Sequence, residues 1–278
     1  MIETVHTFGA EESLIGIVTE PEAGTPGRPA VVLLNSGLLP RTGTFRLHVI
    51  LARALARLGF LVLRFDLAGI GDSLQHLDGR SHAEQVAGDI QDAMDYLASV
   101  YQHDSFVLAG LCTGADNAHK AAVADPRVVG AVFIEGYVYP TMGYYIRRYI
   151  PRFFKLTPLL NRLRCLLKTV TMADAKRVDD HAHILDYGWE LPPKEQTEKD
   201  LMVLVRREVQ LLYFFCGTNS GFQYGNQIKD AFRAIDFRGR LQVCYLPEAS
   251  HTFMFMKSRD QFIHLLGAWM KSCFGSAP

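Results

Sequence analysis

The stretch FVLAGLCTGADNAHKAA, residues 106–122, joins an apolar run of strand length to a run with helical spacing, and Cys112 stands at the junction. Gly110 and Gly114 lie two positions before and after it. A residue held in a strained strand-to-helix turn tolerates no bulky neighbours at those positions. The helix beyond the turn favours a thiolate, because its free N–H groups point at the sulfur. The pattern indicates a displayed nucleophile; the alternative is a small, inert cysteine packed in a glycine-rich turn.

Strands and helices alternate along most of the chain. Apolar runs or alternations predict strands at 4–8, 14–19, 30–37, 60–67, 105–110, 128–136, 209–217 and 241–247. Apolar residues at helical spacing predict helices at 47–58, 86–97, 113–124, 196–207, 224–235 and 260–273. This order predicts an α/β fold with a mostly parallel central sheet and helices on both of its faces.

One segment interrupts the alternation. Residues 137–195 contain no good strand; two helix-like pieces rich in aromatic and basic residues, MGYYIRRYIPRFFKL and LLNRLRCLLKTV, precede a Pro-rich and charged stretch. Long insertions in compact domains are usually lids or binding elements. We therefore predict a core domain formed by 1–136 and 196–278, with a helical lid at 137–195.

The composition excludes several classes of protein. The 278 residues are 49% hydrophobic, which is enough for one large core, and 29 basic residues balance 29 acidic ones. That balance gives no sign of a basic surface for nucleic acid. The sequence has no uncharged apolar run of about 18 residues, so no membrane span is predicted. The five cysteines show no CxxC pairing, so we expect reduced thiols and neither a disulfide framework nor a zinc site. Residues 1–21 show no basic stretch followed by an apolar one, so we expect a cytoplasmic protein, and we expect no metal and no cofactor.

Two further components of a nucleophilic site have candidates. His251, in LPEASHTF at 246–253, follows the last predicted strand, where a general base is expected in a sheet that carries such a nucleophile. The N–H of Thr113, next after the nucleophile, and that of Leu38, in the loop after strand 30–37, are candidates for an oxyanion hole. Gly37 would let this loop approach closely; the alternative is that residues 35–37 merely end a strand.

Four motifs resemble those of the α/β-hydrolase superfamily: NSG at 35–37, FDLAGIGDS at 65–73, GLCTGA at 110–115 and SHTF at 250–253. Within it, the chain looks most like the hydrolases found with exosortase A systems, which share comparable LARAL, VLRFD and GDS segments, a GLC elbow, a DPRV stretch and a Tyr/Arg-rich start of the lid. The resemblance covers most of residues 30–150 and weakens in the lid. It implies the α/β-hydrolase fold, in which Asp66 and the glycines after it shape a structural turn.

The residue that would orient the histidine departs from the family pattern. The superfamily usually places an acid after the penultimate strand, but the loop FFCGTNSG at 214–221 contains no carboxylate. Three alternatives remain open. Asn219 orients His251, as asparagine does beside a Cys-His pair; Glu135 supplies a carboxylate from the neighbouring strand, a location that some superfamily members use; or Cys112 and His251 act as a dyad, because a thiol needs less activation than a hydroxyl.

The candidate substrate-binding residues lie near the start of the lid and beside the oxyanion loop. Tyr137, Tyr139, Tyr144 and Tyr145 are candidates for the entrance of an apolar pocket, with ordinary lid packing as the alternative, and Ser36 completes the set. The lid is also rich in basic residues: Arg147, Arg148, Arg152, Lys155, Arg162 and Arg164. They are explained as a solvated helix face; a docking surface for an acidic acyl carrier protein is the alternative.

Together these residues predict covalent acyl transfer. His251 would take the thiol proton or hold a preformed ion pair with Cys112. Cys112 would attack an ester or thioester carbonyl, and water would release the acyl group. A cysteine acyl-enzyme is itself a thioester, which favours a thioesterase acting on a small-molecule acyl thioester or ester. The alternatives are an acyltransferase with an amine or alcohol acceptor, and a binding or scaffold protein without catalysis, in keeping with the missing acid.

Overall fold

The computed structural model describes residues 1–22, 27–154 and 191–275, and their side chains except at 151–154. The centre of the molecule is a sheet that has eight strands within these residues, in the order β1-β2-β4-β3-β5-β6-β7-β8. β1 and β2 form an antiparallel pair, and β2 joins β4 in antiparallel fashion. The strands from β3 to β8 are parallel to their neighbours. The predicted α/β architecture is confirmed.

Every predicted strand is present, with shifted ends. The strands are β1 (Ile2–Phe8), β2 (Leu14–Glu20), β3 (Ala30–Leu34), β4 (Val62–Phe65), β5 (Phe106–Leu111), β6 (Val128–Ile134), β7 (Gln210–Cys216) and β8 (Leu241–Leu246). β3 ends three residues before the predicted boundary, because Asn35 turns its side chain onto the neighbouring loop and accepts a hydrogen bond from the N–H of Leu67 at 2.9 Å.

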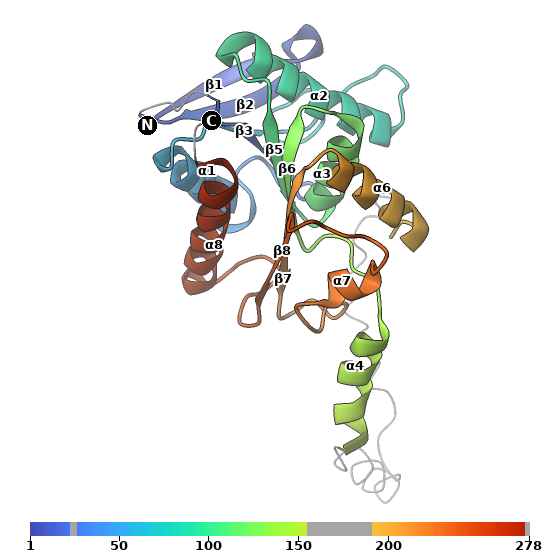
Figure 1. Ribbon diagram of the computed structural model, residues 1–278. Coiled ribbons are helices and arrows are strands. Elements are labelled where there is room, and N and C mark those ends of the chain that lie inside the picture. Colours follow the sequence, from blue (N-terminus) through green and yellow to red (C-terminus); the bar gives the residue numbers. More distant parts are fainter. Residues whose placement is uncertain (23–26, 155–190, 276–278) are drawn as a thin grey trace, which may run out of the picture.

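The helices cover both faces of the sheet. They are α1 (Leu47–Arg57), α2 (His82–Tyr101), α3 (Thr113–Ala124), α4 (Met142–Phe154), α6 (Lys194–Arg206), α7 (Gln227–Ala231) and α8 (Met256–Phe274), with short 3-10 turns at Ala10–Glu12 and Thr44–Arg46. α1 and α8 pack on one face, and α2, α3 and α6 pack on the other (Figure 1). Within the described part of the chain, none of these helices is long and apolar enough to span a membrane.

Alternate side chains of the central strand β5 enter the two cores. Phe106 and Leu108 lie in the core beneath α2 and α3, whereas Val107, Ala109 and Leu111 lie in the core beneath α1 and α8. Successive side chains of a strand point to opposite faces, so a parallel strand covered by helices on both sides must be apolar throughout. The continuous apolar run at 106–111 is the direct consequence.

The start of the predicted lid is helical. α4 matches the first of its two helix-like pieces and projects from the body of the molecule beyond α7 (Figure 1). The second piece and most of the predicted lid, 155–190, lie outside the described residues. Elsewhere, the helix predicted at 224–235 is shorter, and the last helix begins four residues earlier than predicted.

Arg207 ties α6 to the far end of α3. Its guanidinium donates hydrogen bonds to the carbonyl oxygens of Ala122, Val123, Asp125 and Val128, at 2.8, 3.1, 2.5 and 3.3 Å. The last carbonyls of a helix have no partner within the helix, so a multidentate cation is an effective cap. Arg207 thereby anchors the helix whose other end carries Cys112.

We expect the substitution Arg207→Met to lower the free energy of unfolding by about 2 kcal/mol, because it removes a charged donor and leaves partly buried carbonyls unpaired. Urea unfolding followed by circular dichroism measures this loss. Arg206→Met is the matched control, since Arg206 is exposed and its side chain forms no hydrogen bond with the described residues. Equal losses in the two variants would contradict the cap.

Candidate active site

Cys112 occupies a strained turn between β5 and α3. Its backbone has φ 56° and ψ −118°, and non-glycine residues rarely adopt a positive φ. Two contacts hold it there: its N–H donates to the carbonyl of Ile134 at 2.9 Å, and its own carbonyl accepts the N–H of Ala115 at 2.8 Å. Such strain, held by the surrounding backbone, is typical of functional sites. The thiol lies half-buried at the carboxyl edge of the sheet.

We call the strand-to-helix turn at residues 110–114, which displays Cys112, the elbow. Its two glycines are required by close backbone contacts. A Cβ on Gly110 would lie 2.2 Å from the carbonyl carbon of Gly114, and a Cβ on Gly114 would lie 2.5 Å from the carbonyl oxygen of Asn35. Neither neighbour is the flexible end of a side chain, so no alanine fits without moving the main chain. The reason predicted from the sequence for both glycines is therefore confirmed.

His251 lies in the loop between β8 and α8 and reaches the elbow. Its side chain interacts with that of Cys112, and its Nδ1 lies 3.9 Å from Oε2 of Glu135. The interactions with the side chains of Cys112 and then Glu135 raise the pKa of His251 to about 10, against the opposing effect of desolvation. The imidazole therefore lies between the side chains of Cys112 and Glu135 and favours its protonated form.

The backbone of this histidine is held by a residue that sequence reasoning missed. The N–H of His251 donates to Oγ1 of Thr218, at 3.0 Å. Thr218 belongs to the loop after β7, one position before Asn219. The signal that could have found it is its place at the carboxyl end of a parallel strand, where functional loops gather.

Glu135 brings the two candidate partners of His251 together. Its carboxylate, only 2% exposed, accepts hydrogen bonds from the N–H of Cys216 and from Nδ2 of Asn219. Oδ1 of Asn219 in turn accepts the N–H of Gly221 at 2.9 Å and that of Phe222 at 3.2 Å. The amide of Asn219 is thus used to hold Glu135, and Glu135 faces the histidine.

The oxyanion loop lies against the elbow. The N–H of Gly37 donates to Oγ1 of Thr113 at 2.7 Å, which fastens the loop after β3 to the first residue of α3. The N–H groups of Leu38 and Thr113 have no hydrogen-bond partner among the described residues. The predicted reason for Gly37 is wrong: a Cβ there would meet nothing within 4 Å, and the glycine is needed because its φ is +55°.

Asp66 is the buried link between the loops after β3 and β4. Its carboxylate accepts the backbone N–H and the guanidinium of Arg41 and the N–H of Asp72, and Asn35 bridges to it through Nδ2. The position of Gly71 allows this, because a Cβ there would overlap the carboxylate of Asp66. Asp66 therefore shapes a structural turn, as the sequence motif implied. The sequence analysis did not identify Arg41 as a partner of Asp66.

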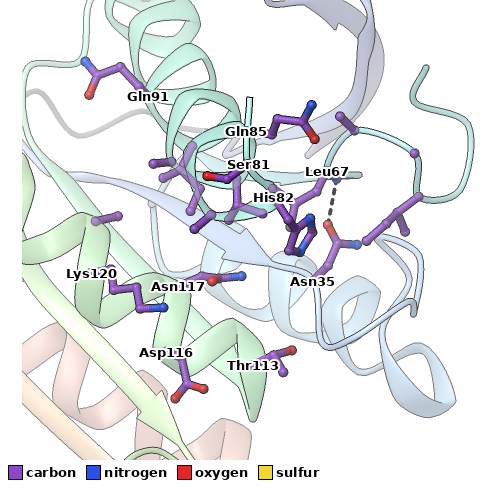
Figure 2. Close-up of a pocket in the computed structure, with 18 of the residues that line it drawn as sticks. Asn35, Leu67, Ser81, His82, Gln85, Gln91, Thr113, Asp116, Asn117 and Lys120 are labelled. Carbon is purple, nitrogen blue, oxygen red and sulfur yellow. Dashed lines mark hydrogen bonds between the residues drawn. The ribbon is translucent and has the colours of Figure 1, made fainter. Parts of the chain in front are cut away.

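A cavity of about 930 Å³ begins at the oxyanion loop. Gly37, Leu38 and Thr113 belong to its lining, as do residues 67–70 and Gln75 of the loop after β4. Most of the other lining residues belong to α2 and α3 (Figure 2). Buried apolar side chains of α2 form one wall, and Asn117 and Lys120 of α3 belong to the other. Cys112 and His251 do not line this cavity.

The five candidate substrate-binding residues lie elsewhere. Tyr137 and Tyr139 are buried at the base of the insertion, where Tyr137 packs edge-on against His119 and the Tyr139 hydroxyl donates to the carbonyl of Pro192 at 2.7 Å. Tyr144 and Tyr145 belong to α4 and contact each other edge-on. Ser36 accepts the N–H of Leu39 with its carbonyl and lies outside the lining of the cavity.

The sequence predicted that the basic residues of the lid form a solvated helix face, but two of them, both in α4, contact other parts of the protein. Arg147 stacks on the ring of Tyr224, with its guanidinium carbon 4.2 Å from the ring centre, and Arg148 donates to the carbonyl of Ser220 at 2.7 Å. These contacts hold α4 to the loop that precedes α7. The side chains of the other four predicted basic residues lie outside the described part of the chain.

Substituting Gly114 by alanine tests the close approach at the elbow. We expect Gly114→Ala to lower the free energy of unfolding by about 2 kcal/mol, because the new methyl group must displace the backbone at Asn35. Gly225→Ala is the matched control: a Cβ there would meet nothing within 4 Å, and its φ is not in the left-handed region. Chemical denaturation of both variants measures the difference, and equal stabilities would refute the contact.

Comparisons with known proteins agree with this architecture. No protein-family model matches the chain, and no curated protein sequence does. An α/β serine hydrolase homologue from Coxiella burnetii is 14% identical, with a TM-score of 0.57 over 96% of this chain and 97% of its own. An esterase of Pyrococcus furiosus is 13% identical, with a TM-score of 0.59 over 99% and 91%. Est1E of Butyrivibrio proteoclasticus, solved with ferulic acid bound, is 13% identical, with a TM-score of 0.61 over 95% and 96%. These similarities show that the chain has the α/β-hydrolase fold.

Proposed function

We propose that the protein is a cysteine-dependent acyl-transfer enzyme that hydrolyses a thioester or ester through an acyl-Cys112 intermediate. The observation that carries the proposal is the contact of His251 with both the Cys112 side chain and the buried carboxylate of Glu135. A nucleophile, a base and a group that orients the base form the arrangement expected for covalent catalysis. The likeness to solved α/β hydrolases and esterases is in keeping with acyl chemistry.

In the first step, the thiolate of Cys112 attacks the carbonyl carbon of the substrate, and the carbonyl electron pair moves to its oxygen. The N–H groups of Leu38 and Thr113 donate to this oxyanion. When the tetrahedral intermediate collapses, the bond to the leaving thiolate or alkoxide breaks, and His251 gives that group its proton. The acyl group is then bound to sulfur as a thioester.

In the second step, neutral His251 removes a proton from water, and the water oxygen attacks the acyl carbon. Collapse releases the carboxylic acid and returns Cys112 as a thiolate beside protonated His251. The His251 side chain is 47% exposed, so water can reach it. This exposure favours hydrolysis over transfer to an amine or alcohol acceptor.

A thioester substrate suits this cysteine better than an oxygen ester does. The acyl-enzyme and a thioester substrate contain the same kind of bond, so acylation is close to neutral in free energy. The raised pKa of His251 keeps a proton available for the leaving group at neutral pH. The argument for a non-catalytic scaffold was a missing acid, and Glu135 offers a carboxylate to the histidine.

Intact-protein mass spectrometry after incubation with an acyl thioester tests the intermediate. We expect an acyl adduct on wild-type protein that disappears in water, and no adduct and no turnover for Cys112→Ala. Cys244→Ser is the matched control, because burial raises the pKa of the Cys244 thiol and keeps it protonated. An adduct that persists until an amine or alcohol is added would favour the acyltransferase. Unchanged turnover by Cys112→Ala would reject the mechanism.

After Cys112, the carboxylate of Glu135 should contribute to the raised pKa of His251. In Glu135→Gln the negative charge beside the imidazole is lost, so the pKa of His251 should fall from about 10 and the imidazolium should lose its proton at lower pH. We expect the basic limb of the pH–rate profile to move down with it, and kcat/KM at neutral pH to fall roughly a hundredfold. Proton NMR of the histidine rings and steady-state kinetics measure the two effects.

Asn219 should act only through Glu135. Asn219→Ala should lower kcat/KM less than Glu135→Gln does, and adding it to Glu135→Gln should cause no further loss. A full additional loss in the double variant would mean that Asn219 orients His251 independently.

A further inference from the structure

We propose that the cavity between α2 and α3 is the acyl-chain site of this enzyme, and that it takes a straight, apolar acyl chain of medium length. The inference rests on the proposed function and names its substrate class. The cavity of about 930 Å³ includes Leu38 and Thr113 in its lining, and these residues carry the proposed oxyanion donors. A carbonyl held by their N–H groups therefore has the cavity open beside it.

The shape of the cavity follows the two helices. Its lining runs from His82 to Met94 on α2 and from Thr113 to Ala124 on α3. At 1.5 Å per residue, twelve residues of helix extend for roughly 18 Å. A cavity lined over that length accommodates an extended chain better than a compact ring.

The chemistry of the walls also favours an alkyl chain. Val86, Ile90 and Met94 are spaced by four residues, so they form a continuous buried stripe along α2. Ala121 and Ala124 of α3 line the same cavity, and their small side chains leave it unfilled. Burial of methylene groups along such a stripe is favourable.

The polar residues of the lining fall into two groups: Asn35, Asp116 and Asp125 are buried, and others are exposed. Gln91 and Lys120 are exposed, whereas the apolar stripe is buried. Lys120 forms no ion pair with any described residue, and its long apolar stem can cover a bound chain while its ammonium group stays in water.

The cavity also separates the two parts of the substrate. Cys112 and His251 do not line it, and the exposed side of His251 adjoins solvent. The acyl chain would therefore extend between α2 and α3, while the leaving group departs past His251.

Filling the cavity tests this assignment. Ala87 lines the cavity and is exposed on α2, so Ala87→Trp places an indole over it without a change in the core. Val100→Trp is the matched control on the same helix, at an exposed position outside the lining. Turnover of acetyl and dodecanoyl thioesters, and calorimetric binding of dodecanoic acid, are measured for both variants and the wild type.

We expect the ratio of dodecanoyl to acetyl kcat/KM to fall at least tenfold in Ala87→Trp and to stay unchanged in Val100→Trp, with dodecanoic acid binding weakened in parallel. An unchanged ratio, with acylation of Cys112 intact, would overturn the acyl-chain site and leave the proposed function standing. Conversely, if no substrate acylates Cys112 but dodecanoic acid binding is lost only in Ala87→Trp, the binding site stands and the proposed function fails.

Discussion

The close approach of three backbone segments at the elbow is the constraint on which the rest of the site depends. The turn at Cys112 packs its own helix start against the end of β5 and against the end of β3, through Gly110 and Gly114. No side chain fits between these segments. The nucleophile is consequently displayed by main-chain geometry, and the loop that carries Leu38 must lie beside it.

Around that turn, polar contacts fix each loop at the carboxyl edge of the sheet. Asp66 joins the loops after β3 and β4, and the Gly37–Thr113 hydrogen bond joins the loop after β3 to α3. Thr218 holds the backbone of His251, and Asn219 holds Glu135. Each of the parallel strands from β3 to β8 thus ends in a loop that is tied to a neighbour or to the site, which is how an α/β sheet makes a rigid site from separate segments.

Glu135 and Asn219 belong to one hydrogen-bonded cluster beside His251. The two residues looked like rival partners for one histidine, but a single cluster contains both. Glu135, buried after β6, needs donors to offset its desolvation, and it receives them from Cys216 at the end of β7 and Asn219 in the loop that follows. Glu135 follows β6, and it is thereby stabilised by the loop after β7, which itself contains no carboxylate.

The sequence by itself determined the order of strands and helices, the elbow and the residues that flank it. Those features are local: apolar runs, helical spacing and two glycines around Cys112 depend only on neighbouring positions. It also identified His251, Glu135 and Asn219 as candidates, because strand ends in a parallel sheet share one edge.

Only the tertiary structure decided which of these groups meet. Glu135 and Asn219 are 84 residues apart, and their hydrogen bond depends on the pairing of β6 with β7. The role of Gly37 was misjudged because a left-handed φ and a close contact both favour glycine, so the sequence alone does not distinguish them. Thr218, Arg41 and the cavity between α2 and α3 were not predicted, since contacts between side chains and the space between helices arise from packing, which no local pattern records.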